Sequence, residues 1–286
     1  MKTRQFLSLI RVPSLSATVV PALVGAATGA QTGRFDHLLW IIFLVVALLM
    51  QMATNVFNEH GDYVKGVDKK ASHGFAGLIV TGVCTPTEIL HVAVALSILA
   101  ALIGGILVVT RGYFMLLLGL VSMLVGVTYS EGPLPLSGTP FGELLVGVVM
   151  GPVEVSAAEL AASGTVTEHA YLYSIPVSLL VAAILLANNI RDLEKDRDAG
   201  RRTIPVLLGK RRATLLFEVV LSMAFIFTVL SAFMVGNPLL LLPLAASPIG
   251  AWGVSRIFSS EWKIGVEMTS MLYLCYGLLL ASGIMT

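Results

Sequence analysis

Charged side chains are scarce in this chain. Asp, Glu, Lys and Arg make up 12% of its residues, whereas a soluble domain carries about 25%. The formal net charge is only +1, so the sequence indicates no nucleic acid as a partner. Cysteine is also rare. Cys84 and Cys275 lie far apart in apolar surroundings, which favours two small buried side chains over a disulfide framework.

Apolar residues dominate the composition instead. They make up 56% of the chain, and the mean hydropathy is +0.89. A membrane span needs about 20 largely apolar residues, and nine segments meet this criterion. We therefore predict an all-α fold, a single domain over residues 1–286 that forms a polytopic bundle of about nine transmembrane helices in a lipid bilayer. The expected spans are 12–31, 37–57, 88–109, 112–130, 141–162, 170–190, 213–235, 238–257 and 266–285.

The distribution of basic residues gives the expected orientation. With the N-terminus in the cytoplasm and alternating spans, all of the 18 Lys and Arg residues except Arg34 and Arg111 fall on the inner side, in agreement with the positive-inside rule. We therefore expect an integral protein of the cell membrane. Its two Asp-rich stretches then lie on the same, cytoplasmic side, where they can meet.

The first of these stretches covers residues 185–212, where an apolar segment ends. Asn188, Asp192 and Asp196 are spaced by four residues, so on a continuing helix they share one face. Oxygen ligands on one face suit Mg²⁺, which takes one or two carboxylates and completes its shell with water and phosphate oxygens. Basic residues follow in the same stretch and are close enough to hold a phosphate: Arg191, Lys195, Arg201 and Arg202.

The second stretch, residues 53–70, repeats the pattern. Asn58 and Asp62 are again four residues apart, and Asp68 follows. Gly61 and Gly66 give the chain freedom to leave the helix and fold back around a ligand. Because carboxylates gathered in one site repel one another, we expect divalent metal and a diphosphate between the two stretches.

The loop between the fourth and fifth spans has a different character. Residues 130–142 are rich in Pro and Gly and contain neither Lys nor Arg. We interpret this loop as a rigid lining of the same mouth, with Tyr129 near its start. A plain turn is the alternative.

These patterns match a known family. Asn58, Glu59 and Asp62, followed by Lys65-Gly66-Val67-Asp68, resemble the first motif of the UbiA family of intramembrane aromatic prenyltransferases. Residues 188–209 resemble the second motif, Asn-Asn-x-Arg-Asp-x-x-x-Asp followed by Ala-Gly-x-x-Thr and Leu-Gly. Tyr129 and the loop after it match the stretch between the motifs. With Asn55 and the Lys-Gly-x-Asp ending, the chain is most similar to the menaquinone branch, which prenylates 1,4-dihydroxy-2-naphthoate.

The resemblance implies a ring of about nine helices around a central cavity. It also implies Mg²⁺-dependent transfer of a polyprenyl group from a polyprenyl diphosphate to an aromatic acceptor. The carried-over catalytic and metal-binding residues are Asp62, Asp68, Asp192 and Asp196, with Glu59 as a further metal ligand. The substrate-binding candidates are Asn58, Asn188, Lys65, Arg191, Lys195 and Tyr129. Arg201, Arg202, Lys210, Arg211 and Arg212 are expected to serve mainly as orientation signals and headgroup contacts.

Three departures leave the acceptor open. Glu59 stands where the family usually has Asp, and Ser72-His73-Gly74 stands where many naphthoate enzymes carry a nearby Arg. The fifth span carries Glu154 and Glu159 in place of an apolar and aromatic run. The alternative acceptors are 4-hydroxybenzoate, a glycerol phosphate lipid or a porphyrin. A cation-coupled transporter is the alternative of another class, since carboxylates in apolar helices fit it as well.

Overall fold

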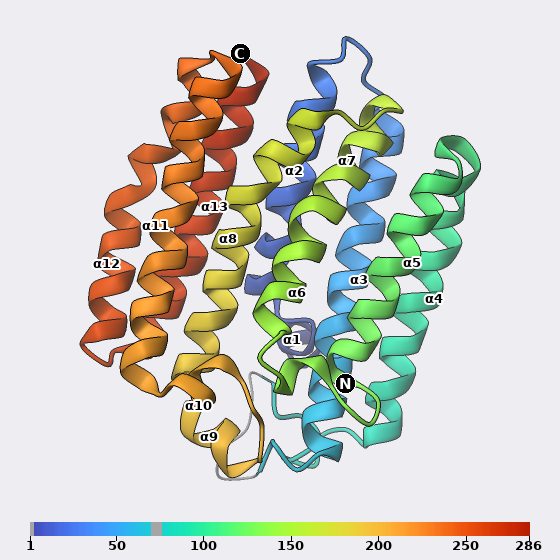
Figure 1. The fold of residues 1–286 in the computed structure, drawn as a ribbon. Coiled ribbons are helices and arrows are strands. Elements are labelled where there is room, and N and C mark those ends of the chain that lie inside the picture. Colours follow the sequence, from blue (N-terminus) through green and yellow to red (C-terminus); the bar gives the residue numbers. More distant parts are fainter. Residues whose placement is uncertain (1–2, 70–75) are drawn as a thin grey trace.

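The computed structural model describes residues 3–69 and 76–286 of the chain, drawn in Figure 1. Residues 72–74, where the second departure from the family pattern falls, lie outside these ranges. Within the described residues the regular structure is helical, and nine helices are long and apolar enough to cross a membrane. This confirms the predicted fold class, while the central cavity stays a prediction.

The nine spans follow the predicted segments closely. They are η1 and α2 (Val12–Leu15, Ser16–Ala30), α3 (His37–Val64), α4 (Pro86–Arg111), α5 (Tyr113–Ser130), α6, η3 and α7 (Gly142–Val148, Val149–Val153, Glu154–Ser163), α8 (Glu168–Arg191), α11 (Lys210–Val235), η4 and α12 (Pro238–Ala246, Ser247–Phe258) and α13 (Trp262–Met285). Four shorter elements complete the chain: α1 (Thr3–Leu9), η2 (Leu136–Gly138), α9 (Leu193–Asp198) and α10 (Ile204–Leu208).

Local sequence explains where the helices begin and change form. Asp36 caps α3 by accepting a hydrogen bond from the backbone N–H of Leu39 at 3.0 Å, and Thr85 and Glu88 form a capping box at the start of α4. In the fifth span, η3 is a short π-helical segment that contains Pro152. Because proline lacks an N–H and its ring clashes with the preceding turn, a wider turn accommodates it there.

The outer surface of the bundle is apolar, as expected for contact with lipid. The side chains of Val109, Phe233 and Leu102 are 87%, 81% and 71% exposed, which a soluble protein would avoid over so large an area. Inside, α2 and α7 approach closely. A Cβ at Gly25 of α2 would collide with α7 at Val155 and Ala158, so small residues allow this contact.

The C-terminal ends of α3 and α8 lie at the same end of the bundle as α9 and α10, at the bottom of Figure 1. α3 is longer than its predicted span of 37–57 and continues to Val64. It therefore carries Asn58 and Asp62 on its last two turns. Gly61 is a helical residue here, and the chain turns instead at Gly66, which has a φ of 68°.

Candidate active site

The first motif is held by the end of α3. The backbone carbonyl of Asp62 accepts hydrogen bonds from the N–H groups of Val67 at 2.9 Å and Asp68 at 3.1 Å. This return of the chain follows the turn at Gly66, which adopts the left-handed conformation that glycine favours. Both carboxylate residues are buried, so the turn places Asp68 close to the helix end that carries Asp62.

The second motif spans a break between α8 and α9. Asp192 is the residue between the two helices, yet the four-residue hydrogen bonds continue through it. The N–H of Asp192 donates to Asn188 at 2.9 Å and the N–H of Asp196 donates to Asp192 at 2.8 Å. The predicted spacing of these three residues is therefore kept, although the helix is not continuous.

The two motifs meet through basic side chains. Arg201 donates from Nη2 to Oδ1 of Asp62 and from Nη1 to Oδ1 of Asp196, the latter at 3.2 Å. Lys195 donates from Nζ to Oδ1 of Asp68 at 2.5 Å. Carboxylates from residues 62 and 68 are thus joined to the segment 195–201, which lies more than a hundred residues further along the chain.

Burial sets the electrostatics of this junction. The residue Asp196 is only 2% exposed, and burial is the largest effect on its carboxyl and raises its pKa. The Arg201 guanidinium acts in the opposite direction, while the carboxylates of Asp192 and Asp62 raise the pKa further. An ionised Asp196 therefore needs positive charge beside it.

Asp192 lies at the exposed rim of the junction. Its carboxylate is held by the neighbouring Arg191, whose Nε and Nη2 donate at 2.8 and 2.6 Å. Asn188 donates from its side chain to the carbonyl of Ile184 at 3.0 Å. Arg201 thus links two of the four predicted Asp ligands, Asp62 and Asp196. The other two, Asp68 and Asp192, pair with Lys195 and Arg191.

The start of the middle loop closes one side of the site. Asn58 donates from Nδ2 to the Ser130 hydroxyl at 3.2 Å, and Lys65 donates from Nζ to the Ser130 carbonyl at 2.5 Å. Tyr129, the residue before, lies within electrostatic range of Arg201 and Asp62. The end of α5 therefore lies beside the first motif, and the lining role of the loop stays a prediction.

Glu59 has partners that differ from those of the four aspartates. Its Oε1 accepts from the backbone N–H of Leu78 at 2.6 Å and its Oε2 from that of Gly77 at 3.3 Å. The side chain is buried and holds the turn at 77–78 against α3. Both carboxylate oxygens therefore have backbone donors, and the role of Glu59 as a metal ligand stays a prediction.

Replacing Glu59 by Gln tests this role. Glutamine has only one oxygen acceptor, so its NH₂ group would face one of the two backbone N–H groups that Glu59 now accepts from. A buried N–H group without an acceptor lowers the free energy of unfolding by about 1–3 kcal/mol. We expect a lower melting temperature with an unchanged Mg²⁺ concentration for half-maximal turnover. A shifted Mg²⁺ requirement at unchanged stability would instead assign Glu59 to the metal.

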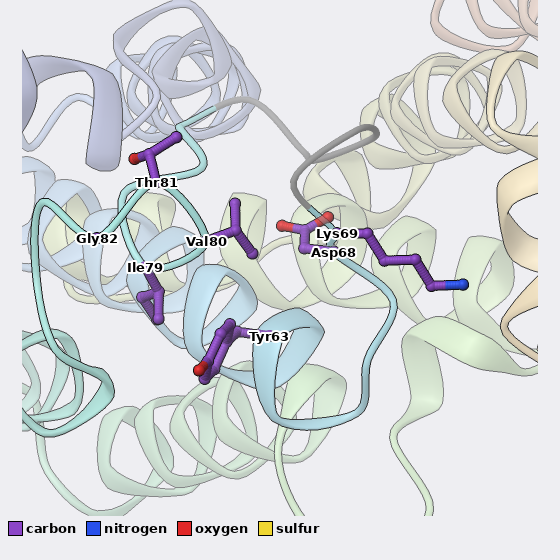
Figure 2. A pocket seen from close by; sticks show the side chains of 7 residues that line it. All are labelled: Tyr63, Asp68, Lys69, Ile79, Val80, Thr81 and Gly82. Atoms are coloured by element: carbon purple, nitrogen blue, oxygen red, sulfur yellow. The ribbon is translucent and has the colours of Figure 1, made fainter.

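A pocket of about 420 Å³ adjoins the first motif, and Figure 2 shows its lining. Asp68 and Lys69 lie on one side, and Ile79, Val80 and Thr81 on the other. Because Asp68 also pairs with Lys195, this pocket opens directly beside the junction of the two motifs.

The donor set fits a magnesium ion that is shared with a phosphate ligand. Within residues 3–69 and 76–286, no three His, Cys, Asp or Glu side chains lie close enough to hold a metal ion by themselves. Mg²⁺ is commonly bound by one or two carboxylates plus substrate phosphates. Asp62 and Asp196 form such a pair, since they already hold one positive charge between them in the form of Arg201.

Arg201 was expected near the phosphate but mainly as an orientation signal, and its pairing with Asp62 and Asp196 was not predicted. The signal that could have identified it is its place in the Ala-Gly-x-x-Thr match, directly after Gly200. A second buried pair also went unnoticed. Asn189 donates to Oε1 of Glu143 at 2.8 Å, and Oε2 of this glutamate has no hydrogen-bond partner among the described residues. This pair ties α6 to α8 beside the site.

The fold and the paired motifs are those expected of an intramembrane prenyltransferase. The sequence pattern of the UbiA prenyltransferase family matches residues 18–279, and the chain belongs to this family. It is 34% identical over 282 residues to 1,4-dihydroxy-2-naphthoate octaprenyltransferase of Bacillus subtilis, covering 97% of this chain and 91% of that protein.

Solved structures agree on the fold. A UbiA homolog from Aeropyrum pernix K1 superimposes with a TM-score of 0.73 at 20% identity, covering 94% of this chain and 96% of that one. A UbiA homolog from Archaeoglobus fulgidus, bound to GPP and Mg²⁺, superimposes with a TM-score of 0.68 at 18% identity, covering 97% and 99%. The fold of the described residues is therefore shared with these structures.

Proposed function

We propose that the protein transfers a polyprenyl group from a polyprenyl diphosphate to 1,4-dihydroxy-2-naphthoate, in a Mg²⁺-dependent step of menaquinone biosynthesis. The observation that carries this proposal is the junction of the two Asn/Asp motifs at one end of an apolar bundle. Its basic and acidic groups suit a metal-bound diphosphate, and the surrounding spans suit an isoprenoid tail. The similarity to the Bacillus subtilis enzyme supports the naphthoate as acceptor.

Each group at the junction has a task in this reaction. Asp62, Asp68, Asp192 and Asp196 would hold Mg²⁺, and Asn58 and Asn188 would support them. When bound, the metal stabilises the negative charge of the departing diphosphate. Lys65, Arg191 and Lys195 would bind the phosphate oxygens, and Tyr129 would line the mouth. The apolar spans exclude water, which would otherwise capture the allylic cation.

The reaction is balanced and needs no further reactant. The bond between the allylic carbon and the diphosphate oxygen breaks, and the diphosphate leaves with the electron pair. A bond then forms between the allylic carbon and the acceptor ring. The ring carboxylate departs as carbon dioxide and leaves its bonding electrons with the ring.

The location and orientation of the protein in the membrane follow from its basic residues. We infer an integral protein of the cell membrane, with the N-terminus and both motifs in the cytoplasm. Arg34 and Arg111, the basic residues that the expected orientation leaves outside, lie together in a pocket with Asp36 and Ser163, on loops and helix ends remote in sequence from the two motifs. The basic residues near the motifs instead suit the cytoplasmic side.

A turnover assay with two acceptors tests the function. Purified protein in nanodiscs receives geranylgeranyl diphosphate, Mg²⁺ and either 1,4-dihydroxy-2-naphthoate or 4-hydroxybenzoate. We expect a prenylated naphthoquinol with release of carbon dioxide, at a rate at least about tenfold above that with 4-hydroxybenzoate, the scale of discrimination that one pocket contact provides. Prenylation of 4-hydroxybenzoate alone would contradict the acceptor, and transport without any prenylated product would contradict the reaction.

A further inference from the structure

Arg201 occupies the position between the two motifs where positive charge is required. It is the cation that bridges Asp62 of α3 and Asp196 of α9, and its side chain is 15% exposed. Two carboxylates share this one guanidinium, so the group retains a net negative charge. The arrangement therefore has room for more positive charge than Arg201 supplies.

The stem of Arg201 is held while its charged end faces the carboxylates. Gly200, with a φ of 72°, turns the chain after α9, and the N–H of Arg201 donates to the carbonyl of Asp196 at 2.9 Å. On the other side, a Cβ at Gly138 would lie 3.2 Å from Cγ of Arg201. The backbone and the first part of the side chain are thus fixed, and only the end of the side chain has to rotate to release either carboxylate.

A divalent cation and Arg201 compete for the same two carboxylates, Asp62 and Asp196. Arg201 bonds to Oδ1 of both carboxylates, and a divalent cation bound to the same carboxylates would repel the guanidinium at short range. A guanidinium released from them stays at the junction, because its stem is fixed, and it binds phosphate oxygens well through its planar fork of donors.

We propose that Arg201 is a resident counter-cation, which holds Asp62 and Asp196 together before metal binds and transfers to the diphosphate when the metal takes the carboxylates. This inference rests on the proposed function and adds a sequence of events to it. Metal alone binds against the charge of Arg201, whereas metal with diphosphate gives Arg201 a new partner. Binding of the two ligands is therefore coupled through this side chain, and the coupling is reciprocal.

The test is the affinity for Mn²⁺, used as a spectroscopic substitute for Mg²⁺ and measured by electron paramagnetic resonance without any turnover. In Arg201→Gln, Mn²⁺ alone is expected to bind about fivefold or more tightly than in the wild type, since the charge of Arg201 no longer opposes it. Adding inorganic pyrophosphate is expected to strengthen Mn²⁺ binding about fivefold less in the variant than in the wild type. Both figures are the lower range of measured couplings between sites.

The matched control is Arg197→Gln. Arg197 lies four residues before Arg201, on α9, and also pairs with a carboxylate, Glu194, at 2.6 Å, but this pair is exposed. We expect its Mn²⁺ affinity and its pyrophosphate coupling to equal those of the wild type. If Arg201→Gln fails to fold, Arg201→Met replaces it, because methionine keeps an apolar stem without the charge and should change both quantities in the same directions.

The possible outcomes are separable. Unchanged or weaker Mn²⁺ binding by a folded Arg201 variant overturns the counter-cation role while leaving the proposed function in place. If Asp62→Asn binds Mn²⁺ as tightly as the wild type, Asp62 does not hold the metal and the counter-cation role falls, whereas the proposed function falls only if the turnover assay yields no prenylated naphthoquinol.

Discussion

Replacing Asp196 by Asn should lower the rate of polyprenyl transfer by about 10²–10³-fold. The expected loss equals that measured when one preorganised charge-stabilising group is removed from an active site. Asp196 is buried, and its carboxylate is shared with Arg201, so an amide there would remove one oxygen proposed to bind the metal and would leave Arg201 less well compensated. The measurement is single-turnover transfer at saturating Mg²⁺ and diphosphate.

Asp198→Asn is the matched control for this change. It makes the same substitution two residues along α9, on an exposed side chain outside the junction. We expect its rate to stay within about twofold of the wild type, since surface substitutions away from a functional site have small effects. Equal losses in the two variants would mean that charge along α9, rather than a buried metal ligand, determines the rate.

A second large effect is expected from Gly61→Ala. Gly61 lies on α3 where this helix passes the end of α5, and a Cβ there would collide with the carbonyl oxygen of Ser130. That carbonyl accepts from Lys65, and the Ser130 hydroxyl accepts from Asn58. The added methyl group would therefore push α3 and the end of α5 apart at the level of Asp62. We expect unfolding to become easier by about 1–3 kcal/mol and transfer to slow by about 10²-fold, as for a displacement of about 1 Å.

Gly105→Ala provides the comparison. Gly105 is also a helical glycine in a membrane span, but a Cβ there would meet no atom within 4 Å. This substitution should leave the rate unchanged and should not lower the melting temperature, because alanine is the better helix former. Thermal unfolding followed by circular dichroism, together with the turnover assay, checks both variants. A Gly61→Ala protein as stable and active as Gly105→Ala would contradict the close contact of α3 with Ser130.

The sequence predicted the spans and the meeting of the motifs for physical reasons. Uncharged runs of about 20 residues have few alternatives to spanning a bilayer, and the spacing of Asn188, Asp192 and Asp196 survives the break after α8 because its hydrogen bonds continue. The sequence did not show which cation pairs with each carboxylate. Which cation reaches Asp62 depends on how the segment after α9 folds back, and this is decided by the turn at Gly200 and the contact of Arg201 with Gly138.

The fifth span shows the same limit. The sequence assigned no role to Glu154 or Glu159, and the structure gives them different surroundings. Glu159 accepts from the backbone and hydroxyl of Thr167 at 3.0 and 2.7 Å, which ties the end of α7 to the start of α8. For Glu154, Oε1 is buried and has no hydrogen-bond partner among the described residues. Partners supplied by a neighbouring helix leave no trace in the spacing of one segment.

The wide π-helical turn of η3 also adjusts the phase of this span. An α-helix turns by about 100° per residue, and a π-helical turn takes up one residue more than an α-helical one. The face of α7 that carries Val155, Ala158 and Ala162 is thereby aimed at Gly25 and Gly29 of α2. Deleting a single residue from 149–153 would rotate this face away from its partner, so the length of this segment is constrained more tightly than the identity of its side chains.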